Sequence, residues 1–122
     1  MREILFRGKG INDKEWRYGF YTEQQGYPYI TPDGVAMYEI DANTAGQYTG
    51  FADKNGKKIF EGDIVCMDDW IPPCMQVAYA QGAFYLAEIE KPVKYYGDIY
   101  YLNHGGKPNA KVIGNIYDDL SY

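Results

Sequence analysis

The chain has 122 residues, of which 46% are hydrophobic and 17% aromatic, and its 12 basic and 17 acidic side chains give a net charge of −5. This length fits one domain, and the aromatic content excludes disorder because ring burial can offset the conformational entropy of the chain. The negative charge excludes a general attraction to a phosphate backbone, and no apolar run reaches the ~20 residues that cross a bilayer.

The first third of the chain has the pattern of short strands separated by turns. Turn signals recur about every eight to twelve residues, a spacing typical of all-β sandwiches and barrels. Trp16, Tyr18 and Phe20 alternate with other residues and therefore fall on one face of a predicted strand. The expected strands here are Ile4–Arg7, Trp16–Tyr21 and Tyr27–Ile30.

The rest of the chain continues this pattern. Asn55-Gly56 favours a tight hairpin turn, because both residues tolerate positive φ. The last strand has apolar residues throughout, so we expect it in the centre of a sheet, whereas residues 91–103 fit either a short helix or a strand. The expected strands are Gln47–Gly50, Lys58–Phe60, Ile64–Met67, Met75–Ala80, Ala83–Glu90 and Val112–Tyr117.

Three segments together carry a family resemblance. They are Arg2–Arg7, the long central block Gln47–Val65 and Val112–Tyr117, in this order along the chain. The sequence resembles the YopX family of proteins, encoded by bacteriophages and by prophages in bacterial genomes. The resemblance implies a mainly β fold, an SH3-like β-barrel over residues 44–122 with an N-terminal β-hairpin extension over residues 1–43. It implies no reaction and no functional residue.

The acidic residues of the central block invite two functional interpretations. Glu61 and Asp63 could serve as a general acid and base or as metal ligands, but we expect both to cap a tight turn. The segment Asp53–Gly56 suggests a calcium loop, yet the matching first and twelfth positions are Phe51 and Gly62, which offer no side-chain oxygen. A turn is the interpretation that remains.

The histidine and the cysteines do not complete a recognisable centre. His104 lacks an identifiable nucleophile and orienting group, so we assign no catalytic residue. Cys66 and Cys74 with His104 provide at most three of the four usual zinc ligands, so we expect no metal and no cofactor. The two cysteines could face each other across a hairpin, but we expect a reducing cytoplasm to keep them as free thiols.

Aromatic side chains are the remaining functional candidates. The chain has 14 tyrosines, and its candidate interface residues are Trp70, Tyr95, Tyr96, Tyr100 and Tyr101. Such rings can form the centre of a protein interface or stack on single-stranded bases. We favour a protein interface, because few basic residues accompany them.

These observations lead to one hypothesis and two alternatives. The first is a non-enzymatic phage or prophage accessory protein that binds another protein or a second copy of itself. The alternatives are a small nucleic-acid-binding β-barrel and an enzyme with an unrecognised site. The start of the chain, Met1–Arg7, has too few apolar residues for a signal peptide, so we expect a location in the bacterial cytoplasm without membrane attachment.

Overall fold

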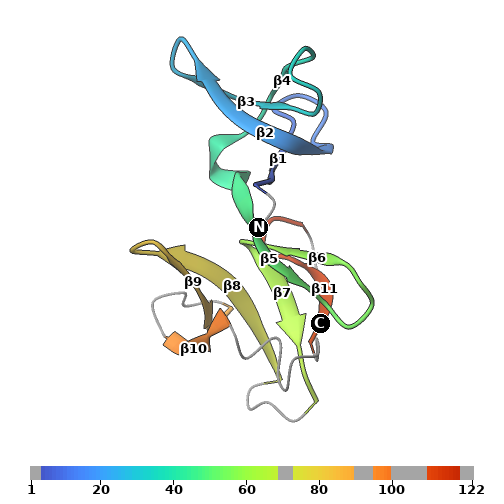
Figure 1. Cartoon of the computed structure of the whole chain (residues 1–122), viewed down its shortest axis with the longest axis vertical. Coiled ribbons are helices and arrows are strands. Elements are labelled where there is room, and N and C mark those ends of the chain that lie inside the picture. Colours follow the sequence, from blue (N-terminus) through green and yellow to red (C-terminus); the bar gives the residue numbers. More distant parts are fainter. Residues whose placement is uncertain (1–3, 69–72, 90–94, 100–109, 119–122) are drawn as a thin grey trace. The chain divides into compact units, whose positions relative to one another are not determined.

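The computed structural model describes residues 4–68, 73–89, 95–99 and 110–118. In this part of the chain all regular elements are strands apart from one short 3₁₀ turn, and the strands form two antiparallel sheets (Figure 1). The mainly β prediction is therefore confirmed. The elements are β1 Phe6–Lys9, β2 Trp16–Gln24, β3 Tyr27–Thr31, β4 Tyr38–Glu39, η1 Ala42–Thr44, β5 Gly46–Ala52, β6 Lys58–Phe60, β7 Asp63–Cys66, β8 Cys74–Ala80, β9 Ala83–Ala87, β10 Tyr95–Asp98 and β11 Lys111–Asn115.

The chain divides into two compact units, residues 1–48 and residues 49–122. The first unit holds the strand order β4-β3-β2-β1-β5, and β5 continues beyond Tyr48 into the second unit, where its neighbour is β6. The hairpin β2–β3 turns at Gln25 and Gly26, which both adopt positive φ. On one face of this sheet Ile30 and Ile40 are completely buried and the rings of Phe6 and Tyr21 pack together.

The second unit contains a five-stranded sheet with the order β10-β9-β8-β7-β11. Each strand pairs with its neighbour in antiparallel register, and the two outer strands are not neighbours of each other. The closed barrel that we expected is therefore wrong for the described residues. The core of this unit consists of Ile59, Val65, Met75, Val77, Phe84, Leu86, Ile99, Ala110 and Val112.

One detail differs from the sequence-based expectations. The last strand, β11, lies at the edge of its sheet rather than in the centre. Its apolar run is divided between Val112, which reaches the core, and Ile113, which is exposed. Within the ambiguous residues 91–103, the described part Tyr95–Asp98 is a strand that pairs with β9.

Candidate functional site

The structure describes little of the aromatic cluster that the sequence analysis selected. Trp70, Tyr100 and Tyr101 lie outside the described residues, as does His104. For Tyr95 and Tyr96 the structure gives the backbone, which belongs to β10. The interface proposed for these side chains stays a prediction.

A different set of aromatic residues is exposed on the first sheet. Tyr18 and Phe20 lie two residues apart on β2 and are 46% and 58% exposed, and Tyr27 on β3 is 57% exposed. Tyr27 pairs with Gln24, whose side chain shares a face with Tyr18 and Phe20 because side chains alternate along a strand. We call Tyr18, Phe20 and Tyr27 the aromatic face.

Trp16 of β2 lies on this same sheet face, and two cations of β1 are close to its ring. The Arg7 guanidinium lies 4.6 Å and the Lys9 ammonium 5.6 Å from the centre of the Trp16 ring. Lys9 pairs with Trp16 and Arg7 with Tyr18 in the β1–β2 register, so these contacts follow from the strand pairing. Arg7 is only 3% exposed. Lys9 is half-buried.

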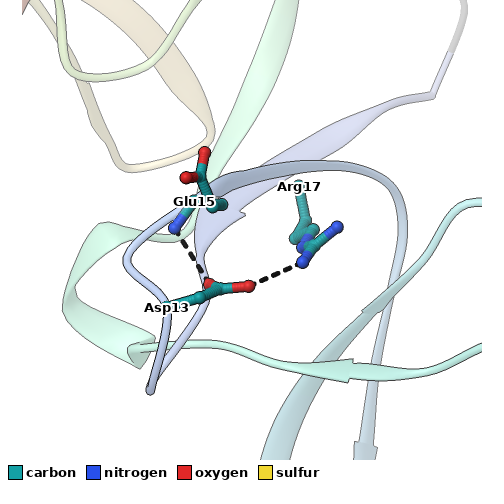
Figure 2. A network of polar contacts seen from close by, with 3 residues as sticks. All are labelled: Asp13, Glu15 and Arg17. Atoms are coloured by element: carbon teal, nitrogen blue, oxygen red, sulfur yellow. Dashed lines mark hydrogen bonds and ion pairs between the residues drawn. The ribbon is translucent and has the colours of Figure 1, made fainter.

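The opposite face of β2 carries a compact polar network (Figure 2). The Asp13 carboxylate accepts hydrogen bonds from the Glu15 backbone N–H at 2.9 Å and from the Arg17 guanidinium at 2.6 Å. These two bonds hold the pKa of Asp13 below its usual value, with the Glu15 N–H the larger cause. Arg17 also lies over the Tyr38 ring, 4.2 Å from its centre. The network closes the loop between β1 and β2 by internal bonds, so we assign it a structural role.

Two carboxylates of the central block, Asp53 and Asp63, bind backbone N–H groups. Asp53 is 3% exposed and accepts hydrogen bonds from the N–H groups of Asn55, Lys57 and Val112. Asp63 is 1% exposed and accepts one from the Phe60 N–H at 2.8 Å. The described residues contain no group of three or more His, Cys, Asp or Glu side chains placed to hold a metal ion.

The two cysteines form a disulfide, which corrects the expectation of free thiols. Cys66 on β7 and Cys74 on β8 are direct partners in the strand register, with Cα atoms 4.1 Å apart. A hairpin that brings the two cysteines together is compatible with the sequence, and the expectation of free thiols depended on a reducing compartment. The register brings the sulfur atoms together irrespective of compartment.

The comparison with known families identifies the family of the chain. The profile of the YopX protein family matches residues 5–120, nearly the whole chain. The chain belongs to the YopX family. No curated protein matches it.

The central YopX-like block has a structural explanation in this chain. Gly50, Gly56 and Gly62 all adopt positive φ, at 91°, 84° and 92°, a region that glycine enters without steric cost. Asp53 and Asp63 satisfy backbone N–H groups beside these turns. The block therefore shapes the β5–β6 hairpin and the turn into β7, as expected for residues that serve folding.

The aromatic face was missed as a site, although the alternation of Trp16, Tyr18 and Phe20 was visible in the sequence. Such alternation does not reveal which face of a strand is covered.

Among the described residues, no helix has the length and apolar character needed to cross a membrane.

Proposed function

We propose that this YopX-family chain is a non-enzymatic accessory module of a bacteriophage or prophage that works by contact with another protein chain. The observation that supports it is the aromatic face, where Tyr18, Phe20 and Tyr27 are each about half exposed on one side of a sheet. Tyrosine and other aromatic residues supply much of the binding energy of protein interfaces. Family membership supports the phage or prophage origin.

The energetics of the aromatic face favour a protein partner. Covering the exposed parts of three rings would contribute on the order of 3 kcal/mol, from ~25 cal/mol per Å² of apolar surface. The sheet already fixes the backbone beneath these rings, so ordering them costs little additional entropy. A sheet face is also flat enough to be covered by a second sheet or helix.

The test compares substitutions on and away from the aromatic face. Tyr18→Ser and Phe20→Ser should abolish self-association in sedimentation equilibrium, or capture of a specific host protein, because each removes an exposed ring. Ile113→Ser is the matched control, since Ile113 is a 38% exposed apolar residue of the second unit. The proposal fails if the wild-type chain is monomeric and captures the same proteins as the Tyr18→Ser and Phe20→Ser variants.

Single-stranded nucleic acid is the second candidate, and one observation favours it. Lys9 lies beside Trp16 on the sheet face that carries Tyr18 and Phe20, and aromatic rings with a nearby cation can stack bases and contact phosphates. Fluorescence anisotropy with a labelled oligonucleotide tests this. Micromolar or tighter binding at ~0.15 M salt, lost in Lys9→Gln, would favour nucleic acid over protein as the partner.

Two further proposals concern the architecture of the second unit and the location of the chain. The second unit, although its described strands do not close, is proposed to be related to SH3-like barrels, which an experimental structure of the whole chain would test. The cytoplasm is the proposed location. Fractionation of cells that express the chain checks it.

A further inference from the structure

The disulfide between Cys66 and Cys74 lies on the sheet face that points away from the core cluster of the second unit. Val65 and Met75, which adjoin the two cysteines along their strands, pair with each other and belong to that core. Because side chains alternate along a strand, the cysteines project from the opposite face. Both cysteines are half-buried, so part of each residue faces the solvent.

The backbone holds the two strands together on both sides of the disulfide. On one side Val65 pairs with Met75 in the β7–β8 register. On the other side the Met67 N–H donates to the Pro73 carbonyl at 2.9 Å. Breaking the sulfur–sulfur bond removes neither of these contacts. The two thiols therefore stay opposite each other after reduction, and this proximity favours formation of the bond again within the folded chain.

The two sulfur atoms differ in the charges that surround them. Lys111 of β11 is the direct partner of Cys66 in the strand register, so these two side chains project from the same face of the sheet. Lys111 is exposed, as is Lys54, whose backbone N–H donates to the carbonyl of Ala110 beside Lys111. Cys74 belongs to β8, and neither β8 nor its other neighbour β9 contains a charged residue.

Two described acids lie near the ends of these strands. Asp68 opposes the effect of Lys111 on Cys66, but it is exposed and lies beyond the end of β7, whereas Lys111 is the direct cross-strand partner. Glu88 follows β9, next to β8, and therefore acts on the side of Cys74. A cation stabilises a thiolate, so Cys66 is the sulfur that carries the negative charge more readily after reduction.

We infer that Cys66 and Cys74 form a reversible redox site, which a small thiol reduces with Cys66 as the leaving thiolate. The thiolate of the small thiol attacks Sγ of Cys74, the sulfur–sulfur bond breaks, and its electron pair stays on Sγ of Cys66. A second small thiolate attacks the small-molecule sulfur of the mixed disulfide and releases Cys74, which takes a proton from water. Two small thiols are thereby oxidised to one disulfide. This inference goes beyond the proposed protein contact, because it involves none of the residues of the aromatic face.

The experiment determines which cysteine of the reduced, folded chain reacts first. The whole chain is reduced with millimolar 2-mercaptoethanol, an uncharged thiol, separated from it and treated with limiting iodoacetamide at pH 7. Peptide mass spectrometry then locates the label, and Cys66 should carry more of it than Cys74. Lys111→Gln should lower the labelling of Cys66 roughly twofold and change that of Cys74 less, as expected for one solvent-screened charge beside a thiol.

Lys14→Gln is the control variant, because it removes the same charge at an exposed position of the first unit and should keep the labelling ratio of the wild-type chain. In urea the preference for Cys66 should disappear, since it depends on the strand pairing. The disulfide of 2-mercaptoethanol should restore the bond in the folded chain. Equal labelling of the folded wild-type chain, a ratio that Lys111→Gln leaves unchanged, or a bond that resists millimolar thiol would overturn the inference.

Discussion

At the scale of single residues, Asp53 makes the stability of the fold depend on pH. Burial opposes its ionisation, but hydrogen bonds from the N–H groups of Val112, Lys57 and Asn55 outweigh burial and hold the pKa of Asp53 below its usual 3.8. A carboxyl whose pKa is lower in the folded than in the unfolded chain stabilises the fold above its unfolded pKa. That contribution is lost as the pH falls from about 4 through the folded pKa.

We therefore predict an acid-dependent loss of stability that depends on Asp53. Asp53→Ala should lower the free energy of unfolding at pH 7 by about 3 kcal/mol, because three N–H groups lose their acceptor at ~1 kcal/mol or more each. Asp53→Asn keeps one acceptor oxygen and should lower the free energy of unfolding at pH 7 by less than Asp53→Ala. Between pH 5 and pH 2.5 the free energy of unfolding of Asp53→Asn should vary less than that of the wild-type chain. Urea unfolding at several pH values measures both, and an unchanged acid dependence in Asp53→Asn would contradict the assignment.

Gly62 provides a second prediction at this scale. An alanine at position 62 would have a strained backbone, with φ of 92°, and its Cβ atom would also meet the Tyr117 ring. An alanine at position 56 would have a similar φ of 84°, but its Cβ atom would meet nothing within 4 Å. Both alanine substitutions should cost ~1–2 kcal/mol for the left-handed backbone. Gly62→Ala should cost a further 1 kcal/mol or so for the displaced ring. Equal thermal destabilisation of the two variants would show that Tyr117 does not rest on Gly62.

At the scale of elements, the register of β7 and β8 determines the disulfide. The bond closes a segment with a sequence separation of 8, and constraining a loop of that size in the unfolded chain contributes about 2–3 kcal/mol in the chain-entropy account. Reductant should lower the free energy of unfolding by this amount. The circular dichroism of the folded chain should not change, because the β7–β8 hydrogen bonds do not need the bond between sulfurs.

The control for the disulfide is the double variant Cys66→Ser, Cys74→Ser, whose stability should not respond to reductant. Wild-type stability that is equally insensitive to reductant would contradict this prediction. Alkylation of the chain inside cells then reports its compartment, since the proposed cytoplasm would keep the pair reduced and open to the reagent.

The elements also show how far the sequence could predict the fold. The strand β6, Lys58–Phe60, was predicted with its observed bounds, because Asn55-Gly56 and Gly62 mark the turns around it. The strand β4 was missed, since two residues give no periodicity. The edge position of β11 was missed because an apolar run does not report how many neighbours a strand has. The aromatic face was missed because exposure depends on what packs against a sheet.

At the scale of the whole molecule, the two units have separate sets of fully buried residues. Ile30 and Ile40 are completely buried in the first unit, and Ile59, Val65 and Val77 in the second. Regions with their own buried contacts open with their own free energies, so local stability need not be uniform along the chain. Ile30 and Ile59 form a matched pair, because each is 0% exposed and loses one methyl group when replaced by valine.

We predict that each substitution acts mainly on its own unit. Ile30→Val should lower the opening free energy of amides in β2 and β3 by about 1 kcal/mol and leave that of amides in β8 and β9 nearly unchanged. Ile59→Val should lower the opening free energy of amides in β8 and β9 and leave that of amides in β2 and β3 nearly unchanged. Native-state hydrogen exchange followed by NMR measures both sets of amides in one experiment. If either substitution lowered protection equally in both units, the chain would open as one cooperative body. A ligand bound at the aromatic face would then raise protection in both units by the same amount.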